Sequence, residues 1–516
     1  MQLPALELKK TLFTHLDNIV GPRGYSLRDA DRLSYSRDSN FRAAIQAHYS
    51  HFENFPAIIT WPENTKQVEM LVKTAIKHNL AITPFGGGSG VCGGAVPRTG
   101  GMVIDLKRMN HILRIDEDRL TVEAEAGIHG LQLEKDLNRH GHTLGHFPSS
   151  ILSATLGGYL AARSAGQLST KYGKIEDMII DLEFVDGQGL VHQTSDISRN
   201  QHVDFTQAIV GNEGTLGLIT KARLKIFPMA EKRLLRAVSF KSLSYGIDAM
   251  RRIMHTGLKP DVMRLYDELD TTLMFSGAKP KKMSLPDLPG LSEARNTIES
   301  ALNYGGRYLK PWLYKFPRLV NTLGGLSWHG NVMILMIEGT SRQAERTLQI
   351  ILGICQDMSA RDLGEDLAQH WYEHRYSVAY KATTLFKEGA FTDTMEVSTT
   401  WDNLTNLYRG VTTALKGQCL VLAHISHVYT DGAAIYFTFV APLTGLKSSL
   451  KLYDKIWQKA LSVTQKQGGS ISHHHGIGRL KKNHIRKEWE DASAIYLKLK
   501  SFFDPNAILN PDVLTQ

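Results

Sequence analysis

The chain has 516 residues, which is long for a single hydrophobic core, so we expect two or three domains. A hydrophobic fraction of 42% and a charged fraction of 22% are ordinary for a globular protein, and the apolar runs fall far short of the ~20 residues that cross a bilayer. The net charge of +9 favours anionic ligands. The three cysteines are widely spaced, which argues against a disulfide framework, and no motif indicates nucleic-acid binding.

The first part of the chain leads to a glycine-rich loop. Residues 1–50 have a helical pattern, and the segment AIITWP that follows is typical of a short strand. Asn64 or Thr65 can cap the next helix. The apolar face of that helix carries Val68, Leu71, Val72 and Ala75.

The loop itself spans residues 82–97 and reads ITPFGGGSGVCGGAVP. It contains the spacing GxGxxG at Gly88, Gly90 and Gly93, but a Rossmann motif should open a helix, and here a second apolar strand follows at 102–106. Where side chains are missing, backbone N–H groups can approach a ligand closely. The pattern therefore predicts a loop between two strands that holds phosphates on its amides.

Two further segments are rich in small residues. After an alternating strand at 120–126 and a helix near 130–139, residues 148–166 read PSSILSATLGGYLAARSAG, and residues 211–220 read GNEGTLGLIT. One such segment is often no more than tight backbone packing. Three of them close in sequence predict an extended ligand that is threaded through the domain.

From residue 229 onward, helices rich in Arg and Lys alternate with apolar strands such as 332–337 and 435–440. The candidates for chemistry here are Arg264 in VMRLYD, Tyr436 in DGAAIYFTF, and the run His473, His474 and His475 in SHHHGIG. Histidine titrates near neutral pH and can move a proton or hold a substrate oxygen. Three adjacent histidines cannot all face one way on an extended backbone, so we expect at most two of them in one site.

The segments PFGGGSG, GHFPSSILSATLGG, KYGKIEDMI and GNEGTLGLIT together resemble the FAD-binding domain of the vanillyl-alcohol oxidase (PCMH-type) superfamily. The resemblance implies an α+β fold, with a PCMH-type FAD-binding domain of two subdomains and an inserted α+β cap domain for the substrate. The implied boundaries are a helical lead-in at 1–50, the FAD domain at 51–228, the cap at 229–470 and a returning segment at 471–516. The loop contains no histidine and Cys92 lies late in it, so we expect non-covalent FAD.

The resemblance also implies which residues contact the cofactor. They fall on four stretches: Pro84, Phe85, Gly86, Gly87, Gly88, Ser89 and Gly90; Ser149, Ser150, Ser153, Thr155 and Gly158; Ala162, Ser164 and Ala165; and Glu213, Gly214, Gly217 and Ile219.

Within the superfamily, VMRLYD, LGED, MEVSTTWD, DGAAIYFTF and GGSISHHHGIGRLKK are most similar to the alkylglycerone-phosphate synthases. That branch uses flavin N5 to exchange the acyl group of acyl-dihydroxyacetone phosphate for a fatty alcohol, without net redox change, in ether-lipid synthesis. The resemblance implies that Tyr436 is the acid/base, that His473, His474 and His475 are needed for activity, and that Arg264 binds substrate. Lys381 stands beside Ala382, where the branch has a substrate-binding arginine, and is a further candidate.

An alternative reading is an FAD-dependent 2-hydroxyacid dehydrogenase or oxidase acting on glycolate or D-lactate. Those enzymes carry GHxGDGNxH and SGEHGIG, whereas this chain has AHISHVYTDGAAIYF and SHHHGIG. His424, His427 and His474 could then form a three-histidine metal site, although our prediction is no metal. A flavin-binding module without catalysis is a third reading, which the retained Tyr436 and histidine run disfavour.

The partners expected from the sequence are a small, lipid-like substrate and a second copy of the chain in a homodimer, with no nucleic acid. Residues 303–328 interleave aromatic with basic side chains, which is typical of a segment that lies on an anionic bilayer. An ordinary cap helix with basic side chains explains the same pattern equally well. The C-terminal VLTQ is not a peroxisomal address, and a cytoplasmic location is the expectation.

Overall fold

The computed structural model describes residues 8–194, 204–275, 316–323, 330–377 and 382–514. The chain divides into two compact units. The first contains residues 1–166, 172–229 and 474–516, and the second contains residues 167–171 and 230–473. The first unit is therefore built from the first 229 residues, apart from 167–171, together with the distant C-terminal segment.

The first unit has two main sheets. One has the strand order β1-β2-β4-β3, in which β2, β4 and β3 run parallel, and the other is antiparallel with the order β5-β6-β10-β8-β9. Its strands are β1 (Tyr25–Ser26), β2 (Ile58–Thr60), β3 (Ile82–Phe85), β4 (Met102–Asp105), β5 (Ile112–Asp116), β6 (Thr121–Glu125), β7 (His142–Thr143), β8 (Ile179–Asp186), β9 (Val191–Gln193), β10 (Gly217–Lys225) and β11 (Phe227–Pro228).

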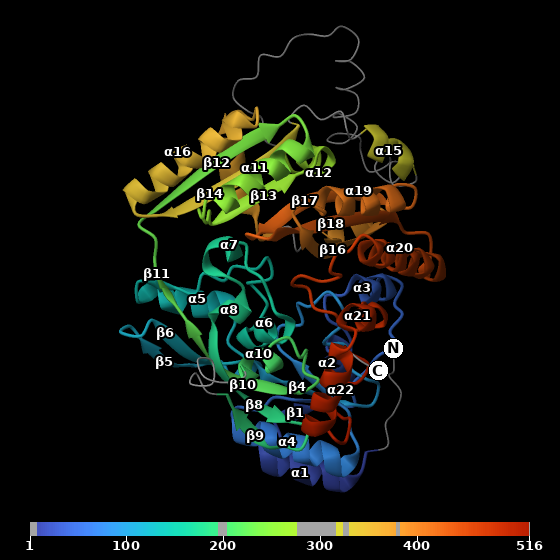
Figure 1. Cartoon of the computed structure of the whole chain (residues 1–516). Helices are drawn as coiled ribbons and strands as arrows, with labels where there is room; N and C mark the ends of the chain where they lie inside the picture. The colour runs from blue at the N-terminus through green and yellow to red at the C-terminus, as the bar shows by residue number, and fades with distance from the viewer. Residues whose placement is uncertain (1–7, 195–203, 276–315, 324–329, 378–381, 515–516) are drawn as a thin grey trace. The chain divides into compact units, whose positions relative to one another are not determined.

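Helices cover these sheets, and α1 packs beside α4 (Figure 1). The helices of the unit are α1 (Lys10–Val20), α2 (Asp29–Ser34), α3 (Phe41–His48), α4 (Thr65–His78), α5 (Gly130–Arg139), α6 (Leu156–Ala162), α8 (Ile175–Met178), α10 (Phe205–Ile209), α21 (Lys482–Trp489) and α22 (Ala492–Phe503), with a 3-10 turn at Leu106–Arg108. The short helix α7 (Ser169–Tyr172) belongs to the second unit except for its last residue, Tyr172, at which the first unit resumes.

Helix α4 delivers the chain to the glycine loop, and its sequence explains both of its ends. The side chain of Asn64 accepts the backbone N–H of Gln67 at 3.0 Å, and Asn79 closes the helix in the left-handed conformation at φ 52°. The residues expected on its apolar face are buried, as predicted. The loop is followed by β4 and not by a helix, which confirms that it is no Rossmann motif.

The C-terminal segment returns to the first unit. Ile82 donates its N–H to the Ile508 carbonyl at 2.7 Å, and Asn510 donates to the Ile82 carbonyl at 2.7 Å. Ile508 and Leu509 are buried in the same hydrophobic core as α1 and α4. The end of the chain thus supports the strand that leads into the glycine loop.

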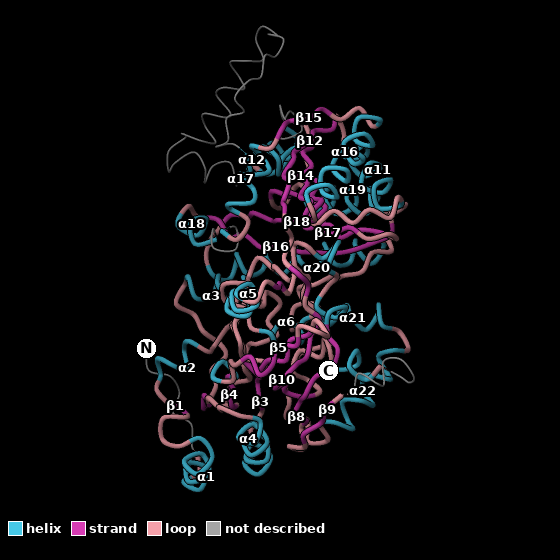
Figure 2. Tube along the Cα trace, turned by 90° about the vertical axis from the view of Figure 1, so that its left-hand side faces the viewer, coloured by secondary structure: helices cyan, strands magenta, loops and turns pink. Residues whose placement is uncertain are grey.

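The second unit is built on a sheet with the strand order β15-β12-β14-β13-β17-β18-β16. Figure 2 shows β16, β17 and β18 of this sheet in magenta. Its strands are β12 (Lys232–Phe240), β13 (Val262–Tyr266), β14 (Asn331–Gly339), β15 (Arg361–Gly364), β16 (Ala390–Thr400), β17 (Leu420–Val428) and β18 (Gly432–Pro442). Its helices are α11 (Leu243–His255), α12 (Glu268–Phe275), α15 (Pro317–Leu323), α16 (Ser341–Asp357), α17 (Asp366–His374), α18 (Ala382–Lys387), α19 (Leu404–Leu415) and α20 (Leu446–Lys466).

Helices lie on both faces of this sheet. On one face, Leu265 of β13 packs toward Gly246 of α11, and Phe437 of β18 stacks on Tyr408 of α19. Because side chains alternate along a strand, Arg264 and Tyr436 point to the other face. There the guanidinium of Arg264 lies 5.8 Å from the ring of Trp371 in α17.

Two sequence expectations fall, wholly or in part, outside the described residues. Lys381 is one, and most of the stretch 303–328 is the other, of which the structure describes residues 316–323 with helix α15. Among the helices that the structure describes, none is both long enough and apolar enough to cross a membrane.

Candidate active site

Two of the small-residue segments meet at the glycine loop. A methyl group at Gly87 would lie 1.7 Å from the carbonyl oxygen of Ser153, and one at Gly86 would lie 2.3 Å from Oγ1 of Thr155. Neither position can accept a larger side chain without moving its neighbour, and at Gly87 that neighbour is backbone. The second segment also contains helix α6, which Thr155 caps by accepting the N–H of Gly158 at 3.4 Å.

The third small-residue segment, residues 211–220, also contacts the glycine loop and the second segment. A methyl group at Gly214 would lie 2.7 Å from the ring of Pro84, and the N–H of Glu213 donates to the Ala161 carbonyl at 3.0 Å. The end of this segment is a strand, because β10 begins at Gly217. The three segments that sequence analysis grouped are therefore neighbours in space within the first unit.

Lys107, which sequence analysis did not single out, stabilises the glycine loop. Its ammonium donates to the Gly86 carbonyl at 2.9 Å and to the buried carboxylate of Asp105 at 2.7 Å. The same ammonium lies 5.1 Å from the ring centre of Phe85. The Asp105 carboxylate also accepts the hydroxyl of Tyr35, so the loop rests on a fixed ion pair.

Glu213 has a second role in the first unit, because its carboxylate accepts the backbone N–H groups of Ile477 at 2.6 Å and Gly478 at 2.9 Å. Burial raises the pKa of Glu213 to about 7, although these two hydrogen bonds oppose the rise. The side chain thus fastens the segment that follows the histidine run. His474 and His475 belong to this unit, and their ring centres are 4.6 Å apart.

In the second unit, strand register places four side chains in one row across the sheet. Glu396 of β16 is paired with Tyr436 of β18, Tyr436 with His424 of β17, and His424 with Tyr266 of β13. Directly paired residues point to the same face, and Arg264 shares it because it lies two residues before Tyr266. The sheet therefore brings two predicted active-site residues, Arg264 and Tyr436, onto one surface.

Arg264 and Tyr436 both contact His424. The guanidinium of Arg264 donates from Nη2 to Nε2 of His424, and Nδ1 of His424 bonds Oδ2 of Asp270 at 2.8 Å. The ring of His424 is stacked on that of Tyr436, with centres 5.0 Å apart and planes 20° apart. Burial and the charge of Arg264 lower the pKa of His424, while Asp270 opposes them.

The phenol of Tyr436 is protonated at neutral pH. Burial raises its pKa to about 12, against the opposing influence of a hydrogen bond with Thr394 and of the positive charge of Arg264. The sequence interpretation required a neighbouring Arg or His to stabilise the tyrosinate, and Arg264 supplies such a charge. The resting residue is nevertheless the neutral phenol.

A β-bulge places a second histidine of β17 on this face. Ile425 is paired with Ile435, but His427 is paired with Ala434, so Ser426 is the extra residue. Without the bulge, His424 and His427 would point to opposite faces because they are three residues apart. The ring centre of His427 lies 5.2 Å from that of His473.

His473 reaches the row because residues 470–473 run beside β16. Ser398 and Ser470 exchange backbone hydrogen bonds of 3.2 and 2.8 Å. Nε2 of His473 bonds the hydroxyl of Tyr429 at 2.9 Å, and its backbone N–H donates to the buried carboxylate of Glu396 at 3.3 Å. Glu396 and Tyr429 were not assigned from sequence, although both lie in quoted segments.

Comparison with known proteins identifies the family. Residues 56–195 match the FAD-binding domain model FAD_binding_4, and residues 229–514 match the C-terminal domain model of FAD-linked oxidases. The chain belongs to the FAD-linked oxidase family. FAD is its cofactor, and its relatives place it in the vanillyl-alcohol oxidase superfamily.

Proteins similar to this chain cover most of its length. It is 29% identical over 498 residues to the alkyldihydroxyacetonephosphate synthase of Dictyostelium discoideum, a match that covers 93% of this chain and 76% of that protein. It is 29% identical over 532 residues to the enzyme of the same name from Trypanosoma brucei brucei, with 99% and 82% covered. A solved alkyldihydroxyacetonephosphate synthase structure superposes with a TM-score of 0.78 at 25% identity, covering 99% of this chain and 86% of that one.

The geometry of the first unit fits FAD. Gly86 and Gly87 lie so close to Thr155 and Ser153 that a side chain at either position would collide with them. At these glycines no side chain screens the backbone N–H groups, which can therefore approach a phosphate closely. The side chain of Cys92 is only 2% exposed, and its carbonyl accepts N–H groups from Arg479 and Leu480. The cysteine is thus built into the packing of the domain.

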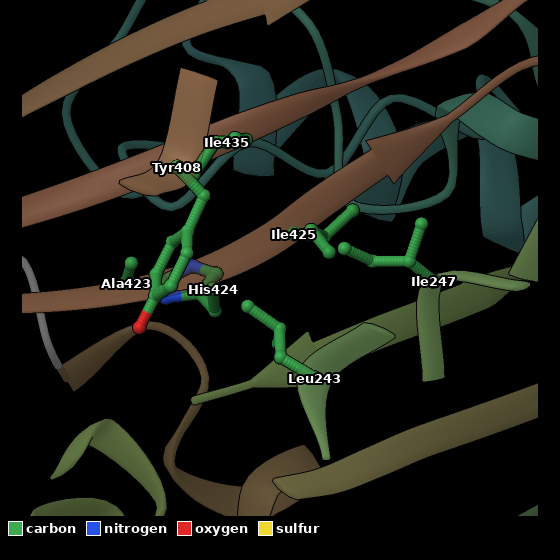
Figure 3. Close-up of a pocket in the computed structure, with 7 residues that line it drawn as sticks. All are labelled: Leu243, Ile247, Tyr408, Ala423, His424, Ile425 and Ile435. Atoms are coloured by element: carbon green, nitrogen blue, oxygen red, sulfur yellow. The ribbon is translucent and has the colours of Figure 1, made fainter. Parts of the chain in front are cut away.

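Figure 3 shows a small pocket in the second unit, which shares only His424 with the row of paired side chains. It encloses about 10 Å³ and is lined mainly by aliphatic side chains, with Leu243 and Ile247 from α11 and Tyr408 from α19. That volume holds at most one water molecule. Apart from His424, its lining includes no residue of the row, so we regard it as a packing gap beneath the helices.

Proposed function

We propose that the protein is an alkylglycerone-phosphate synthase-like transferase, which exchanges the acyl group of acyl-dihydroxyacetone phosphate for a fatty alcohol. The observation that carries the proposal is the sheet face on which Arg264, His424 and Tyr436 are in contact, with His473 bound to Glu396 beside them. Nearly full-length similarity to two alkyldihydroxyacetonephosphate synthases supports the choice of reaction.

In the proposal, FAD is held without a covalent bond by the glycine loop and the two segments that meet it. Bound flavin supplies an electrophilic ring that can take up and return an electron pair, so the reaction needs no external electron acceptor. The bond between the substrate carbon and the acyl oxygen breaks, and a bond between that carbon and the alcohol oxygen forms. The alcohol loses its proton and the fatty acid leaves, so atoms and electrons balance.

The second unit supplies the side chains for proton transfer and binding. Tyr436 exchanges a proton with the substrate carbon, and the charge of Arg264 favours the ionised phenol when that proton is taken up elsewhere. Arg264 binds the anionic phosphate of the substrate. His473, whose Nε2 bonds Tyr429, moves the proton between the entering and the leaving oxygen. His474, His475 and Lys381 retain the supporting roles that the resemblance implies.

The hydroxyacid dehydrogenase alternative is disfavoured by the surroundings of His424. Both of its ring nitrogens are engaged, one with Arg264 and the other with Asp270. A guanidinium within hydrogen-bond distance repels a metal cation. The three-histidine metal site suggested by the sequence, which includes His424, would therefore lose one of its ligands.

A labelling experiment tests the proposal. The purified FAD-loaded protein is incubated with acyl-dihydroxyacetone phosphate and radiolabelled hexadecanol, without an electron acceptor. We expect the label in alkyl-dihydroxyacetone phosphate, with one fatty acid released per ether formed. Fatty acid release without a labelled ether, or no reaction with this pair alongside oxidation of glycolate or D-lactate, would contradict it.

A further inference from the structure

The direction of the hydrogen bonds around His424 fixes its tautomer. A guanidinium only donates, so Nε2 of His424 must accept from Arg264. The proton of the neutral ring is therefore on Nδ1, which donates to Oδ2 of Asp270 at 2.8 Å. The result is a charge-assisted chain that runs from the Asp270 carboxylate through the imidazole to the Arg264 guanidinium.

This chain is sequestered from solvent. Asp270 is 7% exposed and His424 is 8% exposed. Asp270 lies in the first turn of α12, where Asp267 accepts its backbone N–H at 2.8 Å. Helix α12 thus delivers a fixed carboxylate to the edge of β17, and a buried hydrogen bond of this kind is costly to lose.

The same imidazole also supports Tyr436. The two rings are cross-strand partners and lie 5.0 Å apart in a stacked arrangement. One side chain therefore sets the position of both the arginine and the tyrosine. The Nε of Arg264 is buried and has no hydrogen-bond partner among the described residues, which leaves it a donor for a ligand.

We propose that His424 and Asp270 are positioning residues: Asp270 holds His424 as the Nδ1–H tautomer, and His424 orients Arg264 so that its remaining N–H groups bind an anionic group of the substrate. This inference rests on the proposed function only for the identity of the substrate. The anion itself is a phosphate or a carboxylate, and the planar fork of the guanidinium suits both.

Variants of His424 separate its hydrogen bond from its volume. His424→Gln keeps an oxygen that can accept from Arg264, whereas His424→Leu fills similar space without an acceptor. Calorimetric titration of the FAD-loaded proteins with inorganic phosphate, and separately with acetate, measures anion binding directly. Subtracting the binding by Arg264→Met isolates the part that depends on the arginine.

We expect His424→Leu and Asp270→Leu to weaken the arginine-dependent binding at least tenfold, and His424→Gln to recover it to within about threefold of the parent. Tighter binding of phosphate than of acetate identifies phosphate as the anion, and the reverse order identifies carboxylate. Asp261→Asn is the matched control: it changes a carboxylate that is also buried in the second unit but pairs with Lys171 at 2.8 Å instead of with His424, so affinity should be unchanged.

The tautomer has its own readout. Nitrogen-15 histidine spectra of the holoprotein, with the His424 signal identified by its loss in His424→Gln, should show a protonated Nδ1 in the parent and a mixture of tautomers in Asp270→Leu. A protonated Nε2 in the parent would overturn the inference. So would parental anion affinity in a folded His424→Leu, or a parent that binds neither anion.

These measurements use no lipid substrate. If the parent binds phosphate through Arg264 but forms no ether from acyl-dihydroxyacetone phosphate, the proposed function fails and the positioning role of His424 stands. If the ether forms and His424→Leu binds anions as tightly as the parent does, the proposed function stands and the positioning role of His424 fails.

Discussion

Tyr436 combines two features that a proton-transfer group needs, a fixed ring and a nearby positive charge. His424 stacks on one side of the ring, while Arg264 opposes the rise in its pKa that burial causes. The carboxylate of Glu396, its partner on β16, raises the pKa further. These opposing charges make the protonation of Tyr436 sensitive to what binds Arg264.

Tyr436→Phe should lower turnover by roughly 10²- to 10⁴-fold, the usual range for a lost acid/base group. The ring remains and can still stack on His424, so FAD content and thermal stability should stay close to those of the parent. Steady-state rates, together with the flavin-to-protein absorbance ratio, check both statements. A variant with near-normal turnover would remove Tyr436 from the mechanism.

Asp267 gives a prediction on pH dependence. Burial, followed by the charge of Asp270, raises the pKa of Asp267 from 3.8 to about 8. A carboxyl group with a raised native pKa contributes stability that is fully present below about pH 4 and is lost as the pH rises through about 8. The parent should therefore lose stability between pH 5 and pH 9 for this reason.

Asp267→Asn removes that ionisation, so its thermal midpoint should fall less than the parental midpoint between pH 5 and pH 9. Asp454→Asn, at an exposed position in helix α20, is the control and should follow the parent. Parallel curves for Asp267→Asn and the parent would show that Asp267 does not titrate as its burial requires.

At the scale of elements, local signals predicted α4 and the strand after the glycine loop, because caps and apolar periodicity are carried by neighbouring residues. The bulge at Ser426 could not be predicted in this way. A period of two along AHISHV places His424 and His427 on opposite faces, and only pairing with β18 reveals the extra residue. The contact of Asp270 with His424 could not be predicted either, because Asp270 lies in helix α12, which is distant in sequence from β17.

The glycine loop offers an element-scale test. In Gly87→Ala, the new methyl group would meet the Ser153 carbonyl oxygen at 1.7 Å and the Ala154 Cα at 3.0 Å, and backbone cannot rotate away. The loop and the second small-residue segment must separate, so we expect at least a tenfold loss of bound FAD and a lower thermal midpoint. Absorbance at 450 nm and thermal unfolding measure these effects.

Gly353→Ala is the matched control. Gly353 lies inside helix α16, and apart from the helix's own backbone no atom of the described residues lies within 4 Å of the methyl group it would add. Alanine should therefore be neutral or should stabilise the protein by up to ~1 kcal/mol through helix propensity, with full FAD content. If Gly87→Ala behaves in the same way, the packing of the loop is not what shapes the cofactor site.

At the scale of the whole molecule, the sequence predicted the superfamily, the α+β class and the cofactor, because the motifs that carry them are contiguous. It could not predict which side chains of the second unit meet. Arg264, His424, Tyr436 and His473 come from four parts of the chain, and the order of strands in the sheet decides their contacts. The histidine run showed the same limit, because nothing in its sequence distinguished His473, whose backbone N–H bonds Glu396 on that face, from the two histidines that follow it.

Membrane contact remains a prediction from composition. If residues 303–328 lie on anionic bilayers, the protein should co-sediment with phosphatidylserine vesicles at low salt and be released at high salt, because the attraction is electrostatic. Neutral phosphatidylcholine vesicles are the control. Failure to bind anionic vesicles at low salt would contradict the prediction of membrane contact and favour the interpretation of the segment as an ordinary part of the cap.

The most direct test of the central claim is an anaerobic visible spectrum of the FAD-loaded protein. It is recorded in separate cuvettes with acyl-dihydroxyacetone phosphate plus fatty alcohol and with glycolate or D-lactate. We predict that the first cuvette releases fatty acid and returns to the oxidised flavin spectrum at the end of turnover, and that the second remains yellow. Complete and lasting bleaching by the hydroxyacid would contradict the account and make the protein a dehydrogenase.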